Sequence, residues 1–286
     1  MRIDAHMHCW RLVDRDGQWP ARDMPAIYRD FLPDELAPLL VRHRVRHTVL
    51  VQSLPSEADT TFMLDLADRH PFIGAVVGWV DLKHPDAPSR IAAMAQRPKL
   101  RGLRPMLPDL AGQDDWIDDA ALTPAVQAMC EHRLTFDALV LPRHLPALLA
   151  FATRFPQLPI VIDHAAKPLI AQGLTTPWRQ DLERLARLPQ VHCKLSGLVT
   201  EAGSGWTFAQ LESYVEVVLA AFGPHRVMWG SDWPVLELTA DYGSWILACE
   251  LLLEGCGTQE REAVFGATAA RFYRLDGNPQ SKEAFA

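Results

Sequence analysis

Ile3-Asp4-Ala5-His6-Met7-His8 is a short, mostly apolar run that carries two histidines at the start of the chain. The run predicts a β-strand, and because successive strand side chains point to opposite faces, His6 and His8 share one face. An open doubly wound sheet typically has a glycine-rich phosphate-binding turn after its first strand. This chain has histidines there instead, which favours a closed barrel over an open sheet.

Seven further apolar runs follow, each separated from the next by a segment with helical spacing. The predicted strands are Ile3–His8, Thr48–Gln52, Ile73–Val80, Gly102–Met106, Thr135–Val140, Ile160–His164, His192–Ser196 and Val227–Ser231. The predicted helices between them include Thr60–Arg69, Ala87–Gln96, Thr123–His132, Leu145–Arg154, Trp178–Leu188 and Phe208–Phe222. Strands that alternate with helices pair in parallel, so eight such units predict an α/β fold, a (β/α)8 TIM barrel.

The length of 286 residues suits one barrel domain over residues 1–286. Two more helical patterns, Tyr242–Glu254 and Gln259–Tyr273, follow the eighth strand. The irregular segment at about 13–25 contains Gly17, Trp19 and two prolines, and it predicts a mobile loop over the barrel mouth. A polar tail at about 276–286 is expected to fray.

Composition narrows the class of protein. With 49% hydrophobic and 22% charged residues the chain is ordinary globular material, and its net charge of −7 argues against nucleic-acid binding, which needs clustered Lys and Arg. The five cysteines form no CxxC pair, which suits a reducing compartment. No apolar leader or membrane-length apolar run is present. We expect a cytoplasmic monomer or homodimer with no nucleic-acid or membrane partner.

Polar residues gather where three predicted strands end: His6 and His8, His164, and Asp232 within Gly230-Ser231-Asp232-Trp233-Pro234. In a (β/α)8 barrel the carboxyl ends of the strands form the active site, so these residues are expected to meet. Imidazoles and a carboxylate either hold a divalent metal or polarise a carbonyl while the carboxylate takes a proton from water. Both routes predict hydrolysis.

Other side chains are expected to point into the barrel and to bind substrate: Gln52, Trp79, Arg104, Lys194 and Trp233. Lys194 lies on an otherwise buried strand, where a lysine needs a partner. A structural ion pair inside the barrel and a contact with substrate are both open for it. Asp163 precedes His164, so strand alternation is expected to turn Asp163 to the opposite face.

Four motifs together resemble the lactonase branch of the amidohydrolase superfamily, which includes L-fuconolactonase, L-rhamnonolactonase and pyrone-dicarboxylate lactonase. They are Ile3-Asp4-Ala5-His6-Met7-His8-Cys9-Trp10, Val161-Ile162-Asp163-His164-Ala165-Ala166-Lys167-Pro168, Cys193-Lys194-Leu195-Ser196-Gly197-Leu198 and Met228-Trp229-Gly230-Ser231-Asp232-Trp233-Pro234. The resemblance implies a distorted barrel in which His6, His8 and His164 hold and polarise a lactone carbonyl. It implies Asp232 as the base that activates water.

Two features depart from that resemblance. Metal-dependent amidohydrolases generally add a bridging Lys or Glu on strand four and a His on strand five, whereas this chain has Arg104 and Thr135-Phe136-Asp137 there. We therefore expect at most one divalent ion, a zinc held by His6, His8, His164 and Asp232, or catalysis without metal. The stretch Arg101–Pro108 differs from the fuconolactonase form, which leaves the particular sugar open.

The favoured function is hydrolysis of a small lactone, a sugar aldonolactone such as an L-fucono- or L-rhamnonolactone, to its hydroxy acid. Arg104 and Lys194 suit the hydroxyls, the ring oxygen or a carboxylate, and Trp79 and Trp233 suit the walls of the ring site. Two alternatives stay open: decarboxylation of an aromatic or muconic acid on the same barrel, and a catalytically inactive barrel that binds a metabolite. Release of acid without carbon dioxide would distinguish lactone hydrolysis from both alternatives.

Overall fold

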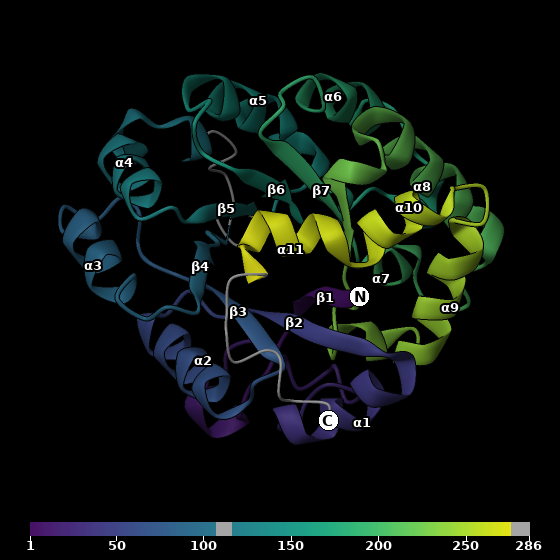
Figure 1. The fold of residues 1–286 in the computed structure, drawn as a ribbon, viewed down its shortest axis with the longest axis horizontal. Coiled ribbons are helices and arrows are strands. Elements are labelled where there is room, and N and C mark those ends of the chain that lie inside the picture. The colour runs from purple at the N-terminus through teal and green to yellow at the C-terminus, as the bar shows by residue number, and fades with distance from the viewer. Residues whose placement is uncertain (107–115, 276–286) are drawn as a thin grey trace.

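The computed structural model, which describes residues 1–106 and 116–275, is built on one eight-stranded parallel sheet (Figure 1). Its strands pair in chain order, and the last returns to the first, since the amide of Asp232 donates to the carbonyl of His6 at 2.8 Å. The predicted distorted (β/α)8 barrel is confirmed. The strands are β1 Arg2–Met7, β2 Val45–Val51, β3 Ile73–Gly78, β4 Leu100–Leu103, β5 Thr135–Ala138, β6 Ile160–Ile162, β7 Val191–Leu195 and β8 Val227–Trp229.

Helices surround the barrel and bury their apolar faces against it (Figure 1). They are α1 Pro33–His43, α2 Glu57–Arg69, α3 Ala87–Met94, α4 Thr123–Glu131, α5 Leu145–Arg154, α6 Trp178–Leu185, α7 Leu198–Ala202, α8 Phe208–Phe222, α9 Tyr242–Leu252, α10 Thr258–Glu262 and α11 Thr268–Tyr273. α1 and α7 are not among the helices predicted from the sequence. Within residues 1–106 and 116–275, no helix has the length and apolar character that crossing a membrane requires.

All eight strands end earlier than predicted, and the residues beyond them turn out of the sheet. β6 stops at Ile162 and β8 at Trp229, so His164 and Asp232 belong to the loops that follow. Both residues have left-handed backbones, with φ of 53° and 61°. Non-glycine residues adopt this conformation rarely, and aspartate and histidine are among those that tolerate it best. The turned backbone places both side chains over the barrel mouth.

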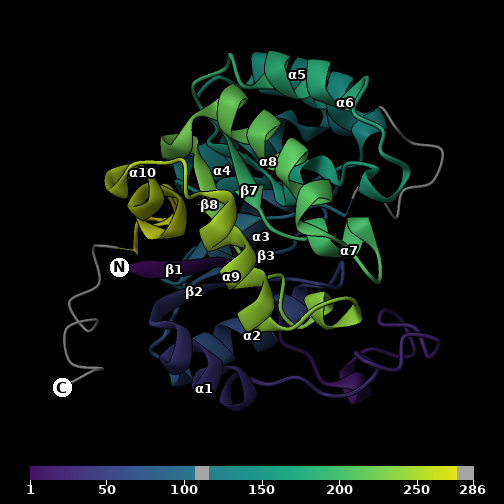
Figure 2. The same ribbon diagram turned by 90° about the vertical axis from the view of Figure 1, so that its right-hand side faces the viewer.

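The segment at about 13–25 is irregular, as predicted, apart from a short 3-10 helix at Leu12–Asp14. Figure 2 shows this purple segment at the end of the barrel opposite α10 and the N-terminus. Several of its side chains line the cavity described below, which agrees with a place over the barrel mouth. Its mobility and the single-domain assignment for residues 1–286 stay predictions, and the predicted tail at 276–286 lies outside the described residues.

The opposite end of the barrel is closed by the C-terminal helices. Figure 1 shows α11, in yellow, crossing the middle of the ring of strands. Its residues pack into a core inside the barrel floor that includes Ile3 of β1 and Val49 of β2. The preceding π-helical turn, Ala263–Ala267, passes so close to β1 that a Cβ on Gly266 would lie 2.0 Å from the carbonyl oxygen of Met1. Glycine is therefore required there.

Candidate active site

The cavity at the carboxyl ends of the strands has a volume of about 620 Å³. This volume falls within the usual range for small-molecule sites, ~300–1,000 Å³. Its lining includes the polar side chains of His8, Arg104, His164 and Asp232. The other lining residues are Gln18, Trp19, Met24, Ser53, Leu54, Pro55, Met106, Leu139, Lys167, Thr200, Val235 and Leu238.

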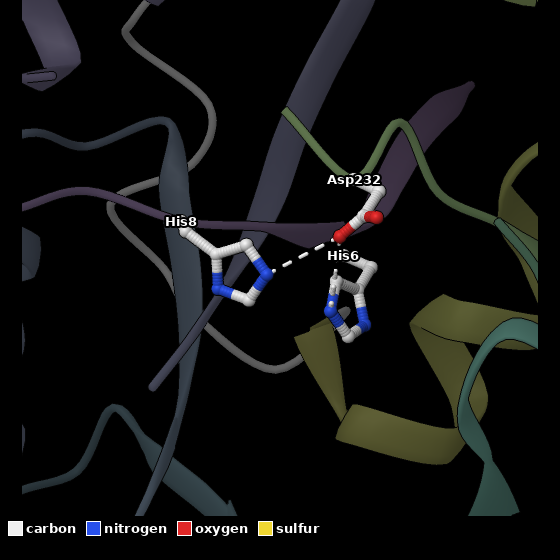
Figure 3. Close-up of side chains that lie close together, drawn as sticks. All are labelled: His6, His8 and Asp232. Carbon is white, nitrogen blue, oxygen red and sulfur yellow. Dashed lines mark hydrogen bonds and ion pairs between the residues drawn. The ribbon is translucent and has the colours of Figure 1, made fainter. Parts of the chain in front are cut away.

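Asp232 Oδ1 is the point at which three imidazoles converge. It lies 3.3 Å from His8 Nε2, 3.7 Å from His6 Nε2 and 3.8 Å from His164 Nε2. Figure 3 shows the rings of His6 and His8 turned toward this carboxylate, although His6 lies in β1, His8 directly follows that strand, and Asp232 lies in the loop after β8. The sequence prediction that these four residues meet at the barrel mouth agrees with this geometry.

Asp4 holds the first and last strands in register beneath this cluster. Its Oδ1 accepts from the backbone amides of Ser231 at 2.8 Å and His6 at 3.2 Å, and its Oδ2 accepts from the Tyr242 hydroxyl at 3.1 Å. The carboxylate therefore ties the loop that carries Asp232 to the strand that carries His6. Asp4 stands in the first motif without a predicted role, although its spacing of two from His6 places it on the same strand face.

The outer hydrogen bonds of the imidazoles decide which ring nitrogen is free. His8 Nδ1 donates to the carbonyl of Val51 at 2.7 Å, so its Nε2 presents a lone pair to Asp232. His164 Nδ1 bonds the Ser196 hydroxyl at 2.8 Å, and a hydroxyl serves either as donor or as acceptor. Gly197 leaves room for this ring, because a Cβ there would lie 2.6 Å from His164 Nδ1.

Burial sets the charges in the cluster. Burial lowers the pKa of His164 to about 4 and the pKa of His6 well below its usual value. Burial alone would raise the pKa of Asp232, but the nearby imidazoles, His164 foremost, hold that pKa well below its usual range. At neutral pH the site therefore combines an ionised carboxylate with neutral His6 and His164 rings.

The donors suit a divalent cation. His6, His8 and Asp232 each offer one ligand atom within 4.8 Å of the others, and nitrogen with carboxylate oxygen is a typical zinc ligand set. The lone pair of His8 Nε2 opposite an ionised oxygen at 3.3 Å is an arrangement that a shared cation or proton stabilises. The cluster thus fits one metal ion, as predicted from the sequence.

His6, Asp163 and His164 form a second group of possible ligands. The negative charge of Asp163 in this group is already balanced by Lys194 and Arg104. Asp163 Oδ1 lies 3.0 Å from Lys194 Nζ, and its Oδ2 accepts from Arg104 Nη1 at 3.1 Å. A second divalent ion would meet both positive groups at close range. This charge balance supports the prediction of at most one ion.

The expected orientation of Asp163 is wrong. Both Asp163 and His164 turn toward the barrel axis, since Asp163 Oδ1 lies 3.4 Å from His6 Nδ1 and the His6 and His164 rings are 4.4 Å apart. Strand alternation does not apply because β6 ends at Ile162 and the backbone is left-handed from His164 onward.

Arg104 reaches the cavity from the end of β4, in agreement with its predicted place. Besides Asp163, its Nη1 lies 3.4 Å from His6 Nε2, and its Nη2 donates to the carbonyl of Gln52. Gln52 Nε2 in turn donates to the carbonyl of Arg104 at 2.7 Å. The guanidinium is therefore held in place in the cavity wall.

Four predicted substrate contacts lie elsewhere: Gln52, Trp79, Lys194 and Trp233 do not line the cavity. Lys194 is fully buried beneath the histidines and pairs with Asp137 at 2.6 Å, which matches the structural alternative left open for it. Gln52 supports Arg104, and Trp233 packs edge-on against Phe31. Strand alternation indicates which side chains point inward but not how far along the barrel axis they lie, and these residues lie below or beside the mouth.

Arg15 shapes the cavity in a way that sequence reasoning missed. Its buried guanidinium donates to the Ser53 hydroxyl at 2.7 Å and to the carbonyl of Trp19 at 2.9 Å. It also lies 5.1 Å from the ring of Trp10. These contacts hold the segment at about 13–25 against β2 and place Trp19 in the cavity wall. The sequence signal was limited to the closeness of Trp10, Arg15 and Trp19 along the chain.

Comparison with known proteins places this geometry in context. The Amidohydrolase family model matches residues 3–275. Two proteins named L-fucono-1,5-lactonase are similar over 96% of this chain and 96% of their own length: one from Burkholderia ambifaria at 56% identity and one from Burkholderia multivorans at 39%. A crystal structure of an amidohydrolase from Burkholderia multivorans with bound Zn has 38% identity and a TM-score of 0.89, covering 96% of this chain and 99% of its own.

Proposed function

Because this chain belongs to the amidohydrolase family, we propose that it is an enzyme that opens a sugar aldonolactone to its hydroxy acid, with L-fucono-1,5-lactone as the substrate. The convergence of three imidazole nitrogens on Asp232 Oδ1 at the wall of a cavity is the observation that supports hydrolysis. The similarity to L-fucono-1,5-lactonases over nearly the whole chain supports the substrate.

Asp232 is the proposed general base. A water molecule between Asp232 Oδ1 and His8 Nε2 would donate one proton to each acceptor and keep a lone pair for the lactone carbonyl carbon. Asp232 takes the proton as the new C–O bond forms. The proton then goes to the ring oxygen as the ester C–O bond breaks, which leaves a hydroxyl and a carboxylic acid.

Arg104 and His164 are the proposed partners of the carbonyl oxygen. Both line the cavity beside Asp232, and the guanidinium of Arg104 offers N–H donors in a fixed orientation. Donors already in place stabilise the negative charge that develops on that oxygen. His8 cannot take this role in the tautomer that its bond to Val51 imposes, because its Nε2 has no proton to donate. A divalent metal held by His6, His8, His164 and Asp232 would supply Lewis-acid polarisation and a more acidic water.

Acid release from the purified chain tests the proposal. L-fucono-1,5-lactone is mixed with the enzyme and a pH indicator beside a no-enzyme blank, an Asp232→Asn sample, and a panel of other pentono-, hexono- and dicarboxylate lactones. The expected result is acid release well above the blank with L-fucono-1,5-lactone among the best substrates. No acid release from any lactone would refute the function, and carbon dioxide from an aromatic or muconic acid would establish the decarboxylase alternative.

The remaining proposals concern the surroundings of the enzyme. A small-molecule lactone is its partner, and we propose that it works in the cytoplasm as a monomer or homodimer without nucleic acid. The net charge of −7 argues against a nucleic-acid partner. The five free cysteines support a reducing compartment such as the cytoplasm. Light scattering of the purified chain measures the oligomeric state.

A further inference from the structure

Lys194 is a fully buried ammonium group with three acceptors around it. Its Nζ lies 2.6 Å from Asp137 Oδ2, 3.0 Å from Asp163 Oδ1 and 3.1 Å from His6 Nδ1. An ammonium group has three protons and no lone pair, so it only donates. A buried donor without an acceptor is costly. Lys194 makes hydrogen bonds to Asp137 and His6, whereas Asp163 Oδ1 is an ion-pair partner without a hydrogen bond, so both hydrogen bonds form only if His6 Nδ1 accepts a proton of Lys194.

That requirement fixes the proton on the His6 ring. A neutral imidazole has one N–H and one lone pair, so a lone pair on Nδ1 puts the proton on Nε2, the nitrogen that faces Asp232 Oδ1 at 3.7 Å. Arg104 Nη1 also approaches Nε2, at 3.4 Å. However, Arg104 lines the cavity, where water or substrate can accept its remaining proton, whereas Lys194 has no such access.

Lys194 is held in place from the barrel floor. The Tyr273 hydroxyl, which α11 carries into the barrel, donates to Asp137 Oδ2 at 2.5 Å, the same oxygen that binds Lys194. Thr135 donates to the other oxygen of Asp137 at 3.1 Å. Tyr273, Asp137, Lys194 and His6 thus form a continuous buried chain of hydrogen bonds from the last helix to the first strand.

We propose that Lys194 is a positioning residue that keeps the His6 proton on Nε2, directed at Asp232, and that Tyr273 holds Lys194 in place through Asp137. His6 then has the opposite tautomer to His8, which presents a lone pair to the same carboxylate. A donor on one side of Asp232 Oδ1 and an acceptor on the other orient the carboxylate toward the attacking water. The kinetic part of this inference rests on the proposed lactonase function.

Nitrogen NMR of chelator-treated wild-type protein with ¹⁵N-labelled histidine tests the proton position directly. Chelator is needed because a metal on His6 would replace the Nε2 proton. The His6 signals are identified by their loss in His6→Asn. We expect a protonated Nε2 and an unprotonated Nδ1 for His6, and the reverse for His8. A protonated Nδ1 on His6, or protons on both nitrogens, overturns the proposal.

Variants then test what holds the proton there. Lys194→Met combined with Asp137→Asn removes one positive and one negative charge, which keeps the buried network neutral. We expect His6 to lose its single tautomer, and kcat to fall about 10- to 100-fold, as for other residues that orient a site residue, with KM nearly unchanged. Tyr273→Phe removes one hydroxyl and is expected to act in the same direction more weakly.

Tyr214→Phe is the matched control, because the Tyr214 hydroxyl is also bonded, to the carbonyl of Leu174 at 3.2 Å, but lies outside this network. It is expected to leave kcat and the His6 signals unchanged. Variants that melt earlier yet keep wild-type kcat and His6 signals would show a structural role only and overturn the positioning role. A wild-type protein that has the predicted His6 tautomer but opens no lactone would refute the proposed function alone.

Discussion

Replacement of Asp232 by asparagine separates catalysis from binding in this site. Because Asn has nearly the same shape as Asp, the cavity and Arg104 stay in place. Asn lacks the charge of Asp, however, and is a far weaker proton acceptor. Loss of a general base typically lowers kcat by about 10²- to 10⁴-fold, or about 2.7–5.5 kcal/mol of transition-state stabilisation. Among the described residues Asp232 is the only carboxylate that lines the cavity, so no neighbour can take over. We therefore expect an effect in the upper half of that range, with KM little changed.

Asp163→Asn is the informative contrast, since Asp163 lies close to the same histidines but is paired with Arg104 and Lys194. Loss of one partner from a buried ion pair costs about 3–5 kcal/mol of folding free energy. We expect Asp163→Asn to lower stability far more than Asp232→Asn does. Asp241→Asn serves as the control on the same stretch of chain, because Asp241 caps α9 and asparagine caps equally well.

Initial rates of acid release over a range of lactone concentrations give kcat and KM, and urea unfolding gives stability. Near-normal turnover of Asp232→Asn would refute its role as the base. A well-folded but inactive Asp163→Asn would show that the two carboxylates have been assigned the wrong way round.

Four other predictions follow from the same geometry. Arg104→Met should raise KM strongly without unfolding the chain, because methionine offers none of the donors that a guanidinium presents in fixed positions; an unchanged kcat/KM would contradict this. Elemental analysis of active enzyme should find at most one divalent ion per chain, with part of the activity surviving chelation; two tightly held ions would refute this. Arg15→Met should raise KM about tenfold by releasing Trp19, since a charged hydrogen bond contributes about 1.5–3 kcal/mol, and Michaelis kinetics measure it. Burial raises the pKa of Asp4 to about 6, so Asp4 lowers the free energy of unfolding as pH rises from 4 to 6. Burial lowers the pKa of His164 to about 4, so His164 raises the free energy of unfolding as pH rises from 4 to 6.5. Asp4→Asn removes the contribution of Asp4, roughly 3 kcal/mol, which opposes that of His164. Urea unfolding between pH 4 and 7 should therefore show a steeper rise in stability for Asp4→Asn than for the wild type.

The barrel was predictable because its determinants are local. Eight apolar runs separated by helical spacing define the strands, and each predicted strand overlaps an observed one. α1 escaped prediction because it contains Pro38, and proline is unfavourable in the interior of a helix. The closure of the barrel floor by α11 depends on contacts between the two ends of the chain, which no local pattern records.

The meeting of the candidate site residues was predictable for a similar reason. His6, His8, His164 and Asp232 lie at or just beyond the ends of strands, and strand ends of a barrel share one face. The cavity wall was less accessible to prediction, because Trp19 reaches it through the folding of an irregular loop. Lys194 shows the remaining limit: its charge on a buried strand indicates a partner, but only the three-dimensional structure shows that the partners are two carboxylates and a histidine.

The return of β8 and α11 to β1 also governs how this enzyme comes into being. A ribosome releases the chain from its N-terminal end, so β1, with His6 and His8, emerges first and has β2 as a neighbour long before β8 exists. Asp232 joins the histidines only after β8 has been made, and Tyr273 reaches Asp137 only after α11 has followed. Nascent chains that end before residue 232 lack the proposed base and cannot catalyse the reaction. Activity therefore begins only after β8 and α11 have been made and have met β1.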